Sequence, residues 1–270
     1  MTNSYVFYLG AKDPEMNRIE SILSNGGYEY FYAHNNGELC NPGTAYSASP
    51  VTPSEGSTPV FVECEPTNSH DLNYINIDHH RPGDFGYSLT SSQYWEASSL
   101  GQLWSLLYPN TTPSHDDKLL AAMDHCFGDA LFGNCPGIDK SEVLYLKLEN
   151  ISKGTNHTLY EVKETLYRYV DVLSKSSTVQ INSEFVIDIT DLDLGVGYSV
   201  DVLTVQLASI MMSKGVLYKT ADKNHGRQKL VLNGQLNFET VQYFMEHWGP
   251  NKGLTNIYGN PYRKYAGGYF

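Results

Sequence analysis

The chain has 270 residues, of which 41% are hydrophobic and 18% charged, and its formal net charge is −12. This length allows one large domain or two moderate ones, and the acidic balance argues against binding a long nucleic-acid duplex, which requires a basic surface. No apolar run approaches the roughly 20 residues of a membrane span, and residues 1–12 lack the basic start of a secretory signal. We therefore expect a cytoplasmic protein with no membrane partner.

The first half of the chain alternates short apolar strands with amphipathic helices. Strands are predicted over 6–9, 28–33, 60–62 and 74–77, and helices over 15–23, 97–108 and 116–132. A stretch rich in Asn, Gly, Ser, Pro and Thr, residues 34–58, predicts a long loop. The order of strand and then helix predicts an α/β fold with a doubly wound, mainly parallel sheet.

The pattern changes after Gly137. A strand is predicted over 143–148 and a helix over 159–173. The elements predicted beyond them are strands over 185–189, 216–219 and 229–232 and helices over 200–212 and 238–247. We therefore predict a first domain over 1–155, a connecting helix and linker over 156–177, and a second, smaller α/β domain over 178–270.

Asp78-His79-His80 directly follows a predicted buried strand, and Pro82 and Gly83 then break the chain into a loop. Open α/β sheets bind their ligands at the carboxyl ends of the strands, so this placement brings a carboxylate and two imidazoles to such an edge. The alternative is a helix-capping Asp beside two surface histidines.

Other acidic side chains occupy comparable positions along the chain. They are Asp13 and Glu15 after the first strand, Glu63 or Glu65 after the third, and Asp124 within a predicted helix. Parallel strands end along one edge, so we expect these groups to converge with Asp78-His79-His80. Carboxylates mixed with imidazole suit Mn²⁺ or Mg²⁺, and such ions activate water and clamp the oxygens of a phosphoryl displacement.

This order of motifs resembles the DHH phosphoesterase superfamily. Its members include single-strand exonucleases, nanoRNA and cyclic dinucleotide phosphodiesterases, and pyrophosphatases. The resemblance implies a metal-binding catalytic domain over 1–155 that holds one or two Mn²⁺ or Mg²⁺ ions. It further implies that 178–270 is similar to the DHH-associated substrate-binding domain, since the segment from Arg263 to Gly268 is similar to that domain's Gly-rich substrate loop.

The resemblance also implies roles for individual residues. The metal ligands would be Asp13, Glu15, Glu63, Asp78, His79 and Asp124, with Glu65 competing with Glu63. Asp78, His79 and His80 would form the catalytic group, in which His80 contacts the substrate phosphate or protonates the leaving group. Arg263 and the backbone of Gly267 and Gly268 would hold the substrate phosphate or ribose.

The chain departs from the family pattern near its first strand. Leu9 stands where members usually carry a His, and Glu15 and Glu63 stand where they usually carry Asp. The longer glutamate moves its carboxylate outward, which a metal site with preferred distances must accommodate. Either the site is re-tuned, with His125 as a compensating residue, or one ion is lost.

The expected function is that of a metal-dependent phosphodiesterase hydrolysing a short oligonucleotide or a cyclic nucleotide. A pyrophosphatase or polyphosphatase is the alternative within the enzyme class, and a non-catalytic DHH-like protein that binds or sequesters a nucleotide is the alternative outside it. The expected partner is a small nucleotide or a short single-stranded oligonucleotide, for which the 21 tyrosines offer stacking surfaces. The sequence leaves a homodimer open.

Overall fold

The computed structural model describes residues 4–222 and 226–270. The chain divides into two compact units, Met1–Ile138 (unit 1) and Asp139–Phe270 (unit 2). The division precedes helix α5 (Lys140–Thr155), which the sequence-based boundary assigned to the first domain. Each unit has its own sheet and its own apolar core.

Unit 1 is built around four parallel strands in the order β2-β1-β5-β6. These strands are β1 (Ser4–Leu9), β2 (Glu29–Tyr32), β5 (Ser57–Val62) and β6 (Ile75–Ile77). The helices are α1 (Pro14–Gly26), α2 (Tyr94–Ala97), α3 (Ser99–Leu107) and α4 (His115–Leu131), and β3 (His34–Asn35) pairs with β4 (Glu38–Leu39) apart from the main sheet. The predicted α/β class and the parallel strands are confirmed.

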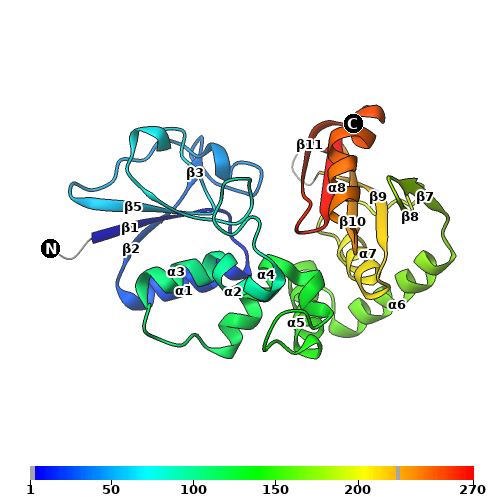
Figure 1. Cartoon of the computed structure of the whole chain (residues 1–270), viewed down its shortest axis with the longest axis horizontal. Helices are drawn as coiled ribbons and strands as arrows, with labels where there is room; N and C mark the ends of the chain where they lie inside the picture. The colour runs from blue at the N-terminus through cyan, green and yellow to red at the C-terminus, as the bar shows by residue number, and fades with distance from the viewer. Residues whose placement is uncertain (1–3, 223–225) are drawn as a thin grey trace. The chain divides into compact units, whose positions relative to one another are not determined.

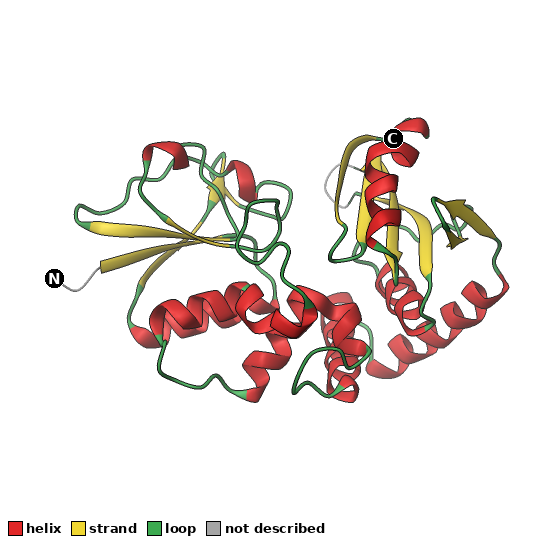
Figure 2. Ribbon diagram, in the orientation of Figure 1, coloured by secondary structure: helices red, strands yellow, loops and turns green. Residues whose placement is uncertain are grey.

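The two faces of the unit 1 sheet are covered differently. Along one face run α1 and α3, whose apolar side chains pack against alternate residues of β1 such as Phe7 and Leu9 (Figure 1). On the other face Tyr8 and Phe61 pack against residues 33–48, where Figure 2 shows mainly loops and short turns. The doubly wound arrangement, with helices on both faces, stays a prediction.

Helix α1 is delimited by local chemistry that is legible in the sequence. The carboxylate of Asp13 accepts a hydrogen bond from the backbone N–H of Met16 at 2.7 Å, and Pro14 stands in the first turn. The helix ends at Gly27, whose φ of 68° is accessible to glycine at low cost. This start places Glu15 in the first turn, buried.

Helix α4 carries Asp124 and His125 in its second half. Ser114 caps its start by accepting a hydrogen bond from the N–H of Asp117, and Asp117 in turn pairs with Arg18 of α1. The helix is kinked at Cys126, whose φ is −148°. The kink directly follows Asp124 and His125.

Unit 2 contains a mixed sheet of six strands in the order β11-β12-β10-β9-β8-β7, in which only β8 and β9 run parallel. The strands are β7 (Thr178–Ile181), β8 (Glu184–Asp188), β9 (Gly215–Ala221), β10 (Gln228–Gly234), β11 (Thr255–Asn260) and β12 (Tyr265–Tyr269). The remaining helices are α6 (Leu159–Lys175), α7 (Val200–Met211), α8 (Phe238–Tyr243), a π-helical turn (Phe244–Trp248) and α9 (Gly249–Asn251).

Two sequence-based assignments in unit 2 are wrong. Residues 143–148 are helical in α5 rather than a strand, because the buried Val143, Leu148 and Ile151 share one helical face and Asp139 caps the helix. Gly267 and Gly268 lie in strand β12 rather than in a loop. Glycine is needed at position 267 because of close packing within the sheet, since a Cβ at Gly267 would lie 2.6 Å from the hydroxyl oxygen of Tyr258.

Candidate metal centre

Candidate ligands from four segments of unit 1 meet near the carboxyl edge of its parallel sheet. Glu63 directly follows β5, His79 follows β6, and Glu15 lies in the first turn of the helix after β1. Asp124 comes from α4. One ligand atom from each of these four residues lies within 4.8 Å of the other three, so they form a single cluster (the four-residue cluster).

Three members of the four-residue cluster are buried, and the side chain of the fourth, Asp124, is 24% exposed. Nε2 of His79 lies 3.0 Å from Oδ2 of Asp124 and 3.5 Å from Oε1 of Glu63. His79, Glu15 and Glu63 are 0%, 1% and 7% exposed. Oε2 of Glu15 and Oε1 of Glu63 are buried and accept no hydrogen bond from any described residue. A carboxylate oxygen buried in this way is destabilised, and a cation is the partner that would satisfy it.

Glu15 is held by the start of helix α3. Its Oε1 accepts a hydrogen bond from the backbone N–H of Leu100 at 3.1 Å, and Oε2 is the oxygen left for the cluster. Asp13 behaves differently from its neighbour, because its carboxylate caps α1 through Met16. The structure therefore brings Glu15, and not Asp13, into the four-residue cluster.

Asp78 fixes the conformation of the Asp-His-His turn. Its Oδ1 accepts hydrogen bonds from the backbone N–H groups of His79 and His80 at 2.7 and 3.0 Å, and it lies 2.9 Å from Nδ1 of His80. Burial alone would raise the pKa of Asp78, but the hydrogen bonds and charge of His80 outweigh it and lower the pKa. Asp78 thus remains a carboxylate that orients His80, while His80 joins Glu63 and His79 in a second group that could hold an ion.

Three further residues contact the ligands, and of these the sequence analysis connected only His125 with the site, as a compensating residue. The side chain of Gln102 donates to the carbonyl oxygen of Asp78 at 3.0 Å and accepts from its N–H at 3.3 Å. Tyr46 donates its hydroxyl hydrogen to Oδ1 of Asp78. Nδ1 of His125 lies 3.3 Å from Nδ1 of His79, so His125 stands behind His79 and outside the four-residue cluster. Such partners orient ligands. The contacts of Gln102 and Tyr46 with Asp78, across 24 and 32 residues, left no signal in the sequence.

The backbone at Glu63 is strained where its side chain enters the cluster. Its φ is 51°, in the left-handed region that residues with a Cβ rarely occupy. Gly10 packs directly against this segment, since a Cβ on Gly10 would lie 2.2 Å from the carbonyl oxygen of Glu63. Unusual backbone conformations concentrate at functional sites, where surrounding structure holds them.

The pKa values of the buried carboxyl groups are raised above their ordinary values in the absence of a cation. Burial raises the pKa of Glu63 to about 8, with further increases from Asp13 and Asp124 and an opposing effect from His80. Burial and the charge of Asp124 raise the pKa of Asp13 to about 6. The pKa of Glu15 is raised well above its ordinary value, first by burial and then by the neighbouring carboxylates. A bound divalent cation would favour the charged carboxylates, and it would therefore oppose the rise in pKa that burial and the neighbouring carboxylates cause.

These shifts predict how the metal-free protein responds to pH. A carboxyl group whose pKa is higher in the folded than in the unfolded state binds more protons when folded, so stability is lost as pH rises. We expect the melting temperature of unit 1 in chelator to fall between about pH 4.5, the ordinary value for Glu63, and about pH 8. Thermal melts at pH 5 and pH 8.5, with and without Mn²⁺, measure this. A melting temperature that rises with pH over this range would contradict it.

The other predicted site residues lie elsewhere. Glu65 pairs with Arg81 at 2.8 Å, outside both candidate groups, so the choice between Glu63 and Glu65 falls on Glu63. Leu9 is fully buried in the apolar core beneath the sheet. Arg263 lies in the turn between β11 and β12, and Gly267 and Gly268 lie in β12, all within unit 2.

No helix among the described residues has both the length and the apolar character that crossing a membrane requires. No protein-family model matches the chain, and no curated protein matches it.

Proposed function

We propose that the chain is a metal-dependent phosphodiesterase that hydrolyses a short oligonucleotide or a cyclic nucleotide. The observation that carries this proposal is the four-residue cluster, in which buried oxygens of Glu15 and Glu63 have no hydrogen-bond donor among the described residues. Three carboxylates and one imidazole suit Mn²⁺ or Mg²⁺. The resemblance of the motif order to the DHH phosphoesterases supports the same reaction, together with a doubly wound first domain.

The cluster residues Glu15, Glu63, His79 and Asp124 would hold the ion. A bound divalent ion would supply the positive charge that acidifies a water molecule and neutralises a phosphate. The surrounding residues keep these ligands in place. Leu100 holds Glu15 through its backbone N–H, and His125 stands behind the ring of His79. Burial excludes bulk water and so strengthens every electrostatic contact within the site.

His80 is the residue we assign to the substrate. Its side chain is 30% exposed, and Nδ1 is held 2.9 Å from Oδ1 of Asp78. This contact fixes the ring, so that Nε2 is the nitrogen for the phosphate or for the leaving oxygen. A protonated Nε2 would donate its proton to that oxygen as the bond to phosphorus breaks, and Asp78 would stabilise the imidazolium before the transfer.

The proposal of a small substrate rests on the net charge of the protein. With a net charge of −12, the chain as a whole does not attract a long polyanion, whereas a small phosphodiester needs only the local charge of the cation. Arg263, Gly267 and Gly268 remain the residues that the family resemblance assigns to substrate binding. The four cysteines are free, which is in keeping with the cytoplasmic location we propose.

The test compares wild type with Asp124→Asn and with the control Asp116→Asn, an exposed residue on the same helix. Each protein is incubated with Mn²⁺ and with dinucleotides, cyclic dinucleotides or pyrophosphate. We expect wild type and Asp116→Asn to cleave a dinucleotide or a cyclic dinucleotide, and Asp124→Asn to lose at least about a hundredfold in rate. Turnover that survives chelator or Asp124→Asn would contradict the proposal. Nucleotide binding without turnover would instead support a sequestering protein.

A further inference from the structure

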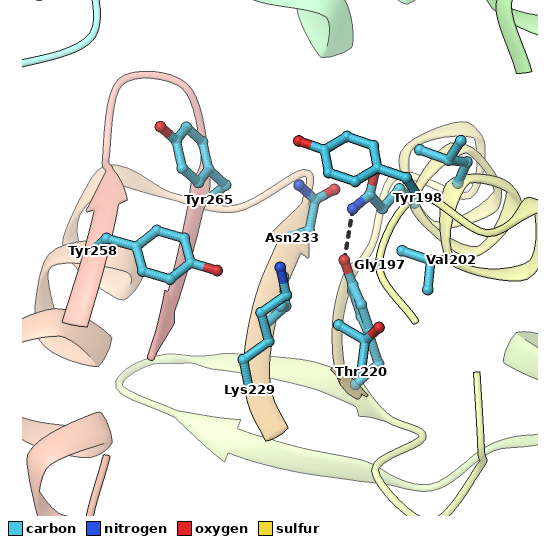
Figure 3. A pocket seen from close by; sticks show the side chains of 12 residues that line it. Gly197, Tyr198, Val202, Thr220, Lys229, Asn233, Tyr258 and Tyr265 are labelled. Carbon is cyan, nitrogen blue, oxygen red and sulfur yellow. Dashed lines mark hydrogen bonds between the residues drawn. The ribbon is translucent and has the colours of Figure 1, made fainter. Parts of the chain in front are cut away.

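Unit 2 contains a pocket of about 260 Å³ on one face of its sheet. Helix α7 and the residues before it form one side, and strands β9, β10, β11 and β12 form the other (Figure 3). The pocket lies wholly within unit 2, so it is distinct in sequence from the four-residue cluster of unit 1. None of its lining residues is among those assigned above to the metal, to catalysis or to the substrate.

The alternation of β10 creates the polar side of this pocket. Lys229, Val231 and Asn233 line the pocket, while the intervening Leu230 and Leu232 belong to the apolar core on the other face. On β9, Tyr218 lies opposite Val231 and Thr220 lies opposite Lys229, so both also face the pocket. The register of the sheet therefore gathers polar side chains from two strands into one concave surface.

Gly267 leaves room for a tyrosine at the edge of the pocket. It lies opposite Val231 of β10 and opposite Tyr258 of β11. A Cβ on Gly267 would lie 2.6 Å from the hydroxyl oxygen of Tyr258. Figure 3 shows the Tyr258 hydroxyl pointing toward Lys229 and Asn233. The absence of a side chain at Gly267 thus lets Tyr258 reach into the pocket.

Two groups in the pocket require a partner of defined chemistry. Lys229 is half-buried, and burial lowers its pKa although the charge of Asp222 acts in the opposite direction. Its ammonium forms no ion pair within 4.0 Å with any described residue. Oδ1 of Asn233 is buried and accepts no hydrogen bond from the part of the chain that the structure describes. An ammonium in this position favours an anion, and an unpaired amide oxygen favours an N–H donor.

We propose that this pocket binds one adenine mononucleotide, with its phosphate at Lys229 and its 6-amino group at Oδ1 of Asn233. The pocket volume limits the ligand to a single mononucleotide, since it is below the roughly 300–1,000 Å³ of pockets that enclose drug-sized ligands. The amide of Asn matches adenine, which presents an amino donor beside a ring-nitrogen acceptor. The rings of Tyr198 and Tyr265, which also line the pocket, offer faces on which a base can stack.

The inference goes beyond the proposed hydrolysis and does not rest on it. Binding is measured on the whole chain by titration calorimetry in EDTA, where metal-dependent turnover is absent. The ligands are adenosine 5′-monophosphate, its analogue with hydrogen in place of the 6-amino group, and adenosine without phosphate. A failure of the phosphodiesterase assay leaves this measurement unaffected, and the reverse also holds.

We expect one equivalent of adenosine 5′-monophosphate to bind, and each of the other two ligands to bind at least about tenfold more weakly. Lys229→Gln should weaken nucleotide binding by about tenfold or more. The control Lys219→Gln removes the same charge from β9 at a residue that does not line the pocket, and it should leave affinity unchanged. Asn233→Leu should abolish the preference for the 6-amino group.

Three results would overturn the inference. They are no binding of adenosine 5′-monophosphate by wild type at millimolar concentration, equal affinity for the analogue without the amino group, and equal losses from Lys229→Gln and Lys219→Gln. The comparison of ligands uses wild-type protein alone, so it decides the question even if a variant does not fold. Thermal melts establish that each variant is folded before its affinity is compared.

Discussion

Replacing Glu63 with glutamine is expected to weaken Mn²⁺ binding by at least about tenfold and to reduce any metal-dependent turnover by at least about a hundredfold. Glutamine keeps the size of the side chain and removes the negative charge at Oε1, which lies 3.5 Å from Nε2 of His79. Calorimetric titration with Mn²⁺ measures the affinity. The matched control is Glu65→Gln, the same change two residues along the chain, at a carboxylate paired with Arg81.

The same variant should make the metal-free protein more stable at high pH. Burial raises the pKa of Glu63 to about 8, so above that value the folded protein carries a carboxylate that its surroundings disfavour. Glu63→Gln removes this penalty, and its melting temperature in chelator should exceed that of wild type at pH 8.5. The difference should shrink toward pH 5, where Glu63 is protonated in the folded state. Unchanged Mn²⁺ affinity in Glu63→Gln would show that Glu63 is not a ligand.

Replacing Gly10 with alanine is expected to destabilise unit 1 by about 3 kcal/mol or more. The new Cβ would lie 2.2 Å from the carbonyl oxygen of Glu63 and 3.2 Å from that of Val62. Both are backbone atoms of the segment that carries Glu63 into the four-residue cluster, so they cannot yield without moving a ligand. Mn²⁺ affinity should therefore fall together with the melting temperature.

Gly154→Ala is the control for this substitution. Gly154 lies within helix α5, and a Cβ there meets no atom within 4 Å. Alanine should stabilise unit 2 by about 0.5–1 kcal/mol, because it favours the helix and restricts the unfolded chain. Metal affinity should not change. A Gly10→Ala protein that melts and binds Mn²⁺ like wild type would contradict the close approach of Gly10 to Glu63.

The helices were predictable where their signals are local. The predicted helix over 159–173 is confirmed as α6, and it begins with a capping box formed by Thr158 and Glu161. The predicted helix over 97–108 is confirmed as α3, which Ser98 caps. The extended backbone of Ser98 separates α3 from the short helix α2, which was not predicted. Residues 143–148 were misassigned because a short apolar run has no periodicity that distinguishes a strand from a helix.

The sequence by itself determined which residue types stand at the strand ends, because apolar periodicity and turn residues act over a few positions. All four members of the cluster, Glu15, Glu63, His79 and Asp124, were therefore candidates from the sequence alone. Asp13 and Glu65 were equally good candidates. The Asp13-Pro14 pair is a local signal for a helix cap, but it does not exclude a metal ligand, and the pairing of Glu65 with Arg81 leaves no local signal.

Only the tertiary structure decided which of these carboxylates lie close enough together to bind one ion. The decision depends on contacts between segments far apart in the chain, such as the N–H of Leu100 on Glu15 and the side chain of Gln102 on the backbone of Asp78. It also depends on the left-handed backbone of Glu63, a conformation that neighbouring residues do not favour and that the packed fold holds in place.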